Sequence, residues 1–221
     1  MKKPLILIIA VLVIDQIIKI FIKTHFTIGQ EVDLIGQWCR IHFVENKGMA
    51  FGMSFGGDFG KFFLTFIRLV ASVLIYFYLQ KLVKRKDKQI VIYSFALIFA
   101  GAVGNIIDSL IYGVMFSEST LFQVATIFPK TGGYAPILFG KVVDMFYFPI
   151  VDTTFPTWIP FVGGQPFHFF NAIFNFSDAS ITIGVILLII SAFIKREPIK
   201  EDEEKNEENE QIIAKNEETI K

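Results

Sequence analysis

Four apolar stretches, each close to 20 residues long, constrain the fold of this chain more than any other feature. They cover about residues 4–22, 62–79, 90–108 and 179–194. A helix needs about 20 apolar residues to cross the hydrocarbon core of a bilayer. With 53% hydrophobic residues, the chain is also more apolar than soluble domains of its length usually are. The sequence therefore predicts a membrane protein with four transmembrane helices.

The first stretch begins like a secretory signal, because Lys2 and Lys3 precede an apolar run. However, Asp15 and Lys19 interrupt this stretch, and no cleavage site of small residues follows it. We therefore interpret residues 4–22 as a retained transmembrane helix.

Lys and Arg collect near the ends of the predicted helices, at residues 2–3, 81–88 and 195–196. Short cytoplasmic loops carry an excess of basic residues, and these three clusters fall on one side of a four-helix topology. We therefore expect a multi-pass membrane protein with both termini in the cytoplasm. The segments at residues 23–61 and 109–177 then lie on the outer face.

The two outer segments differ in character. Polar and apolar residues alternate at residues 37–44, and Asn and Gly follow, which favours a small strand-and-turn unit. The second segment is rich in Phe, Pro and Gly, and aromatic rings suit the headgroup region of a bilayer. We expect it to form an interfacial, partly helical cap. The predicted fold class is thus an all-α membrane protein with four transmembrane helices, a small β-containing outer subdomain and an interfacial cap.

Charge divides the chain into two parts. Residues 1–196 contain 17 Lys and Arg against 11 Asp and Glu, so they carry +6, and residues 197–221 carry −6. We expect a membrane domain at 1–196 and an acidic cytoplasmic tail at 197–221, to which we assign no chemistry. Cys39 is the single cysteine, and no His and Cys cluster has metal-site spacing. Because a phosphate-binding loop and a basic nucleic-acid surface are also lacking, we expect no cofactor, metal or nucleic-acid partner.

Ionisable residues inside transmembrane segments are costly, so each is a candidate for function. Asp15 lies within the first helix, and Lys19 follows one helical turn later, where the two can pair. Asp15 either supports a site or touches a substrate, and the sequence leaves both open. Near the outer end of the third helix, Asn105 and Asp108 share one face. Small residues before them allow a neighbouring helix or a ligand to approach closely, although helix capping is the simpler explanation.

Two further carboxylates are expected at the outer face. Asp178 stands near the start of the fourth helix, where an aspartate commonly serves only as an N-cap. Asp144 is a lone carboxylate among apolar neighbours, a setting that disfavours its charged form.

Five short motifs connect these residues in one order along the chain. They are D-Q-I-I-K at 15–19, N-K-G-M-A-F-G at 46–52, G-N-I-I-D at 104–108, V-V-D-M at 142–145 and F-N-F-S-D at 174–178. Each resembles a motif of the lipoprotein signal peptidases, or signal peptidase II. The resemblance covers about residues 4–194.

The resemblance implies an aspartic endopeptidase of the bacterial cytoplasmic (inner) membrane, with its site at the outer face. Asp144 and Asp178 match the catalytic pair, which removes the signal peptide of a prolipoprotein just before its diacylglyceryl-modified cysteine. The implied partners are such prolipoproteins, membrane lipids and inhibitors of the globomycin type. Matched positions that support the site or hold the substrate are Asp15, Lys19, Asn46, Gly48, Asn105, Asp108 and Asn175.

The chain departs from the family pattern in two ways. Ser109 stands where an arginine usually follows the G-N-x-x-D motif, and we expect Arg68 or Arg40 to supply the missing charge. Insertions at about 113–140 and 149–170 enlarge the outer cap, and we expect them to serve substrate access.

Two other functions stay open at the level of sequence. A transporter or channel subunit would string its ionisable residues across the membrane, whereas a peptidase would gather them at the outer surface. A scaffold protein could keep the fold without the chemistry, but the retained Asp144 and Asp178 argue against it.

Overall fold

The computed structural model of this chain describes residues 2–46 and 57–194. Gly48 and the acidic tail at 197–221 lie outside the described residues. The chain divides into two compact units, residues 1–188 and a second unit that begins at Ile189, within the last helix.

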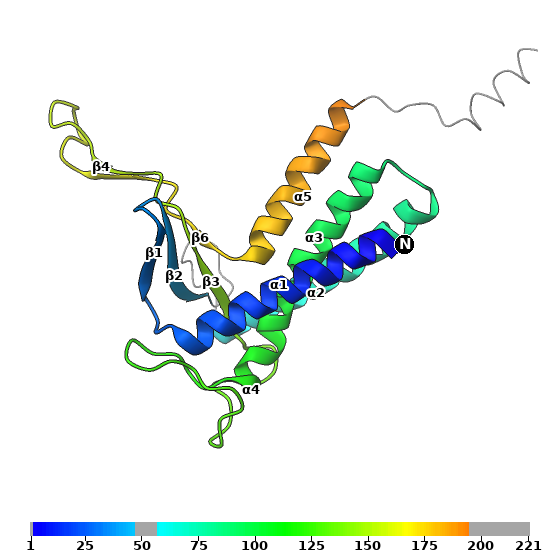
Figure 1. The fold of residues 1–221 in the computed structure, drawn as a ribbon, viewed down its shortest axis with the longest axis horizontal. Coiled ribbons are helices and arrows are strands. Elements are labelled where there is room, and N and C mark those ends of the chain that lie inside the picture. Colours follow the sequence, from blue (N-terminus) through cyan, green and yellow to red (C-terminus); the bar gives the residue numbers. More distant parts are fainter. Residues whose placement is uncertain (1, 47–56, 195–221) are drawn as a thin grey trace, which may run out of the picture. The chain divides into compact units, whose positions relative to one another are not determined.

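Four helices are long and apolar enough to cross a membrane, so the expectation of four transmembrane helices is confirmed (Figure 1). They are α1 (Lys2–His25), α2 (Gly57–Lys84), α3 (Gln89–Ile107) and α5 (Phe176–Phe193). Most of their side chains face outward, and this apolar exposure suits helices that are surrounded by lipid.

The helices extend beyond the expected bounds at the outer end. After α3 the chain continues through a π-helical turn, η2 (Asp108–Tyr112), into the short helix α4 (Gly113–Met115). The apolar residues Leu110 and Ile111 allow this continuation, so the second outer segment begins after Met115 and not at residue 109. Single π turns are uncommon and often occur at functional sites.

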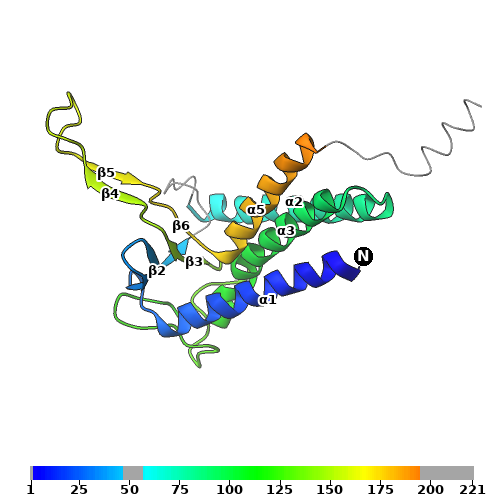
Figure 2. The same ribbon diagram turned by 45° about the horizontal axis from the view of Figure 1, so that its top comes forward.

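An antiparallel sheet lies at the C-terminal ends of α1 and α3 (Figures 1 and 2). Its strands are β1 (Glu31–Ile35), β2 (Cys39–Asn46), β3 (Val142–Tyr147) and β6 (Ile173–Phe174), in the order β1-β2-β3-β6. β2 and β3 align Val44 with Asp144. A second pair, β4 (Val151–Thr154) and β5 (Pro166–Phe169), forms a separate antiparallel hairpin.

Within the expected bounds of 109–177, only η2 and α4 at the start and the first residues of α5 at the end are helical, and the rest of the segment is strands and loops. The strands of this segment were not predicted. β3 escaped notice because its first four residues are all buried, so it lacks the polar and apolar alternation of a half-exposed strand.

An apolar core joins this sheet to the membrane helices. Phe43 of β2, Val143 and Met145 of β3, and Tyr112 of η2 are fully buried in it. The inserted segment at 113–140 contributes Phe116 and Ala125 to the same core. This segment thus helps to hold β3 in place, in addition to enlarging the cap.

Glycines bring α5 close to α3, as the small residues of α3 predicted. A Cβ atom on Gly101 would lie 2.2 Å from the carbonyl oxygen of Ser177 and 2.7 Å from Ile181. On Gly104 it would lie 2.1 Å from the Ser177 hydroxyl oxygen. Close backbone approach through small residues is a common way for helices to associate in membranes.

Replacing Gly101 with Ala should therefore destabilise the protein, because the Ser177 carbonyl belongs to backbone and cannot turn aside. We expect a loss of about 1 to 3 kcal/mol, as for other overpacked sites. Thermal unfolding in detergent measures the loss. Val114→Ile adds one methylene at a position that is 47% exposed and serves as the control. A Gly101→Ala protein as stable as this control would contradict the packing described here.

Candidate active site

Two side-chain amides connect the carboxylates of Asp144 and Asp178. The Asn175 amide donates to Asp144 Oδ1 at 2.6 Å and to Asn105 Oδ1 at 3.0 Å. The Asn105 amide in turn donates to Asp178 Oδ1 at 2.8 Å. The sequence predicted all four residues as parts of one site, and the fold brings them together from α3, β3 and the start of α5.

The first turn of α5 positions Asp178. Asn175 precedes the helix, and its side-chain oxygen accepts a hydrogen bond from the Asp178 backbone N–H at 2.9 Å. The Asp178 carboxylate accepts one from the Asn175 backbone N–H at 3.3 Å. This reciprocal pair is a capping box, which satisfies two backbone donors that the helix leaves free. α5 therefore begins at Phe176, three residues before the expected start, and the N-cap is Asn175 and not Asp178.

The environment of Asp144 favours its protonated form. The side chain is 5% exposed and lies on β3 among apolar neighbours. Burial and the negative charge of Asp178 raise the pKa of Asp144 to about 7, although hydrogen bonds from Asn175 and Asn46 oppose the change. Asn46 at the end of β2 is thus in contact with the site, as the sequence predicted. A carboxyl group with this pKa can hold or release a proton near neutral pH.

The buried ammonium of Lys19 organises the residues beneath the two carboxylates. Its Nζ lies 2.9 Å from Asp15 Oδ2 and 2.8 Å from Asp108 Oδ2, and all three side chains are fully buried. It also donates to Asn105 Oδ1 at 2.9 Å. The expected pairing of Asp15 with Lys19 is present.

Besides pairing with Lys19, Asp15 and Asp108 each accept a hydrogen bond from the backbone of another element. Asp15 Oδ1 accepts the backbone N–H of Ser177 at 2.9 Å, in the first turn of α5. Asp108 accepts the backbone N–H of Val143 in β3 at 3.3 Å. Both carboxylates are therefore occupied by protein groups, which favours a supporting role over direct contact with a substrate.

Gln16 and Tyr112 complete this network, and sequence reasoning missed their role. The Gln16 amide donates to Asp108 Oδ1 at 3.0 Å and to Asp15 Oδ2 at 3.1 Å. The Tyr112 hydroxyl donates to Gln16 Oε1 at 3.0 Å. The sequence could have indicated Gln16, because it is the second residue of the D-Q-I-I-K motif.

Ser109 does not replace the arginine that the family pattern would place there. It is buried, and its hydroxyl donates to the Asn105 carbonyl oxygen at 3.1 Å, within its own helix. Arg68 of α2 interacts electrostatically with both Asp178 and Asp144. Arg40, by contrast, forms ion pairs with Glu31 and Asp33 on β1. Of the two expected substitutes, Arg68 is the one whose charge reaches the site.

A second buried ionic cluster lies on the other side of β3. Glu45 of β2 pairs with Lys23 of α1, and its second oxygen lies 3.0 Å from Lys141 Nζ. Ser119 of the inserted segment donates to Glu45 at 2.9 Å. The ring of Tyr134, from the same segment, lies under both lysines. The cluster thus links α1, β2 and Lys141. Lys141 directly precedes β3 and stands three residues before Asp144.

The predicted residues thus converge with one exception, Gly48, which falls outside the described part of the chain. Within residues 2–46 and 57–194, no group of three His, Cys, Asp or Glu side chains is placed to hold a metal ion. The arrangement offers a pair of electrostatically coupled carboxyl groups, held by side-chain amides where α3, β3 and the start of α5 meet.

The chain is similar to known proteins over most of its length. A family model described as signal peptidase (SPase) II matches residues 7–194. A lipoprotein signal peptidase of Porphyromonas gingivalis is 48% identical over 185 residues, which cover 83% of this chain and 80% of that relative. Another from Amoebophilus asiaticus is 31% identical over 201 residues, covering 90% of this chain and 79% of the relative. A solved structure described as a bacterial membrane enzyme has a TM-score of 0.56 and 26% identity, over 90% of this chain and 95% of the other.

Replacing Glu45 with Gln should lower stability, because Lys23 would stay buried without its carboxylate partner. Removing one partner of a buried pair costs about 3 to 5 kcal/mol. Burial raises the pKa of Glu45, but Lys23 and Lys141 outweigh burial and hold the pKa below its usual range. A carboxylate with a lowered pKa contributes stability at neutral pH and loses it as the pH falls through its folded-state pKa. The difference between wild type and variant should therefore shrink in acid.

Chemical denaturation in detergent at a series of pH values measures this difference. Glu118→Gln is the control, because Glu118 also pairs with Lys141 but its side chain is 64% exposed, and exposed pairs contribute about 0 to 1 kcal/mol. Equal losses of unfolding free energy in the two variants would show that the buried cluster stabilises the protein no more than the exposed pair does.

Proposed function

We propose, from the premise that this chain belongs to the signal peptidase II family, that it cleaves the signal peptide from prolipoproteins and does so as an aspartic endopeptidase. The family makes the chain a protease, and the four apolar helices make it a multi-pass membrane protein. The proposal adds the catalytic type, the residues and the orientation.

One observation carries the catalytic assignment. Asp144 and Asp178 are joined through Asn175 and Asn105, and the negative charge of Asp178 helps to raise the pKa of Asp144. Two such carboxyl groups do not readily ionise together, so one keeps a proton while the other acts as a base. Proteases that lack a nucleophilic side chain use this division of roles to activate water.

In the proposed mechanism Asp178 accepts a proton from a water molecule, and the water oxygen attacks the carbonyl carbon of the scissile peptide bond. Asp144 donates its proton toward the carbonyl oxygen, which becomes negative as the tetrahedral intermediate forms. The intermediate then collapses: Asp178 gives the proton taken from water to the leaving nitrogen, the carbon–nitrogen bond breaks, and the re-forming carbonyl returns its proton to Asp144. Asn105 and Asn175 hold both carboxyl groups in place throughout.

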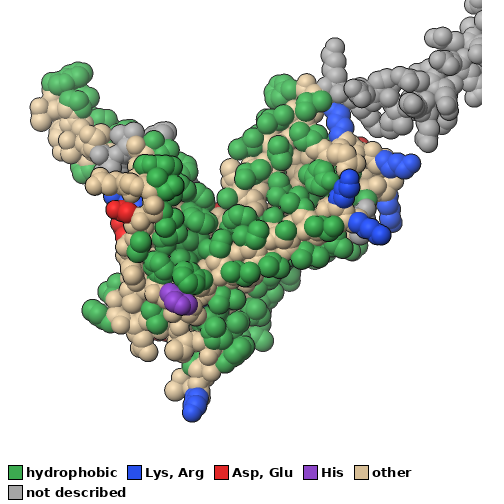
Figure 3. All heavy atoms as spheres, in the orientation of Figure 1, with side chains coloured by type: hydrophobic (Ala, Val, Ile, Leu, Met, Phe, Trp, Pro, Cys, Tyr) green, Lys and Arg blue, Asp and Glu red, His purple; other side chains and the backbone are tan. Residues whose placement is uncertain are grey.

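The position of the site suits a substrate that is anchored in lipid. The basic side chains visible in Figure 3 gather mainly at the end of the helices where α1 begins and α2 ends. The positive-inside rule places this end in the cytoplasm. Asp144 and Asp178 lie toward the opposite end, at the outer face. There the acyl chains of a diacylglyceryl-modified prolipoprotein stay in the bilayer while its peptide bond reaches the pair.

The arrangement of ionisable residues argues against transport. Asp15, Lys19 and Asp108 are in direct contact with one another and, through Asn105, with Asp178. They form one cluster beneath the carboxyl pair, and a transport pathway would spread such residues along the membrane normal.

The function itself is tested with purified protein and a diacylglyceryl-modified prolipoprotein. Asp144→Asn and Asp178→Asn should each lower turnover by about 10²- to 10⁴-fold, because each removes one half of the acid–base pair. The double variant should be scarcely worse than either single one. Globomycin, which we expect to occupy the same site, should block the wild-type reaction. Near-normal cleavage by either single variant, in membranes free of other such peptidases, would overturn the assignment.

The pH profile should depend on Arg68. Turnover should fall on the alkaline side with an apparent pKa near 7, where the pair loses the proton that it shares. A nearby positive charge favours the ionised form of a carboxyl group, so Arg68→Gln should raise this apparent pKa by about one unit and reduce turnover.

Arg68→Lys keeps the charge and should largely restore the profile. Arg85→Gln removes an exposed charge at the far end of α2 and should leave the profile unchanged. If Arg68→Gln shows the wild-type pH limb, Arg68 does not take the place of the arginine absent at position 109.

A further inference from the structure

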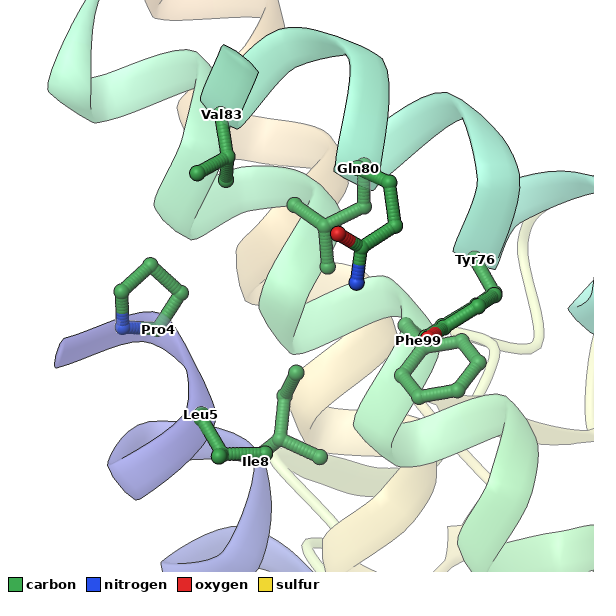
Figure 4. Close-up of a pocket in the computed structure, with 8 residues that line it drawn as sticks. Pro4, Leu5, Ile8, Tyr76, Gln80, Val83 and Phe99 are labelled. Carbon is green, nitrogen blue, oxygen red and sulfur yellow. The ribbon is translucent and has the colours of Figure 1, made fainter. Parts of the chain in front are cut away.

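A pocket of about 300 Å³ lies between three helices at the end remote from the candidate active site. Its wall includes Pro4, Leu5 and Ile8 of α1, Gln80 and Val83 of α2, and Phe99 of α3 (Figure 4). Its volume is at the lower end of the range for ligand pockets. The wall is almost entirely apolar, so a hydrocarbon chain fits its chemistry.

Gln80 distinguishes this pocket from ordinary lipid-facing surface. Figure 4 shows its side-chain amide directed toward the space between the helices. In the part of the chain that the structure describes, this amide has no hydrogen-bond partner. A polar group in an apolar membrane setting is costly unless it forms hydrogen bonds. A ligand that fills the pocket should therefore bring a polar group to Gln80.

The depth of Gln80 identifies which polar group this is. Gln80 lies four residues before Lys84, the last residue of α2, which corresponds to about 6 Å along the helix. A group just inside the end of a membrane helix lies where the acyl chains of a phospholipid join their glycerol. Ester carbonyl oxygens at that depth accept hydrogen bonds from an amide.

Basic residues lie next to lining residues of the pocket in the sequence. Lys3 immediately precedes the lining residue Pro4, and Lys84 immediately follows the lining residue Val83. Both lysines are exposed, and Lys81 and Arg85 lie beside them on the same end of α2. Figure 3 shows this concentration of basic side chains around the start of α1 and the end of α2. Basic pockets between transmembrane helices on the cytoplasmic side bind anionic headgroups.

We propose that this pocket binds one anionic phospholipid of the cytoplasmic leaflet. One acyl chain occupies the apolar pocket, an ester carbonyl oxygen accepts a hydrogen bond from the Gln80 amide, and the phosphate pairs with Lys3 and Lys84. The site is independent of the proposed peptidase reaction, whose lipid-modified substrate enters at the opposite end of the helices. The bound lipid completes the packing among α1, α2 and α3, where Ile8, Leu79 and Ile92 form the local core.

Native mass spectrometry of the purified full chain in detergent tests the proposal. The probes are dioleoylphosphatidylglycerol, dioleoylphosphatidylcholine and free glycerol phosphate. The protein should bind the anionic lipid more tightly than the zwitterionic one, and glycerol phosphate should not compete. Lys84→Gln should weaken binding of the anionic lipid alone, by about fivefold. Gln80→Leu should weaken both lipids by a similar factor, because both carry the ester carbonyl.

Filling the pocket tests the acyl-chain position directly. Val83→Trp should abolish specific binding. If this variant does not fold, Leu5→Trp fills the same space from α1. Val73→Trp places the same ring on an exposed part of α2, and Lys130→Gln removes an exposed charge far from the pocket; both should bind lipid as the wild type does. Equal binding of the two lipids by wild type, or undiminished binding by a folded pocket-filling variant, would overturn the proposal.

Discussion

The buried ammonium of Lys19 is the interaction on which the rest of the site depends. Its three protons meet acceptors on Asp15, Asp108 and Asn105, so its hydrogen-bonding capacity is fully used. Leaving such a charge buried without partners would cost several kcal/mol. The three acceptors must therefore be present together, and their presence fixes α1 against α3. Through Asn105 the same contact determines where Asn175 and the two catalytic candidates lie.

Two ionic clusters of opposite composition hold β3 between them. On one side the single ammonium of Lys19 lies between two carboxylates, and on the other the single carboxylate of Glu45 lies between Lys23 and Lys141. Val143 contacts both sides, because its backbone N–H donates to Asp108 and it pairs with Glu45 across the sheet. Asp144 follows directly. A carboxyl group with a strongly raised pKa needs such fixed surroundings, since small movements would admit water and weaken the effect.

The sequence predicted the helices and most of the site for clear physical reasons. Hydrocarbon excludes polar groups, so apolar length located the four helices, and the exceptions Asp15, Lys19 and Asp108 were visible as candidates. Asp144 stood out as a lone carboxylate among apolar residues, and the shared motifs added Asn175, which no periodicity would have identified.

Other features depend on contacts between distant segments and left little local signal. The first four residues of β3 are buried on both faces, so the strand had no alternation of exposed and buried residues to reveal it. Glu45 and Lys141 are almost 100 residues apart in the sequence, and only the β2–β3 pairing brings them together. The role of Asn175 as helix cap and amide bridge was likewise hidden, because the expected helix began three residues too late. The sequence offered Arg68 and Arg40 equally as substitutes for the missing arginine. Only the fold shows that Arg68 interacts with Asp144 and Asp178, whereas Arg40 pairs with residues of β1.

The capping box at the start of α5 has a consequence for how the protein is made. Asn175 and Asp178 acquire their mutual hydrogen bonds only when the first turn of α5 is wound, and α5 is the last helix to leave the ribosome. Until it enters the membrane, Asp144 lacks the Asn175 amide and its carboxylate neighbour Asp178. Under the proposed assignment, a nascent chain with only the first three helices inserted lacks one half of the acid–base pair and cannot yet cleave a substrate.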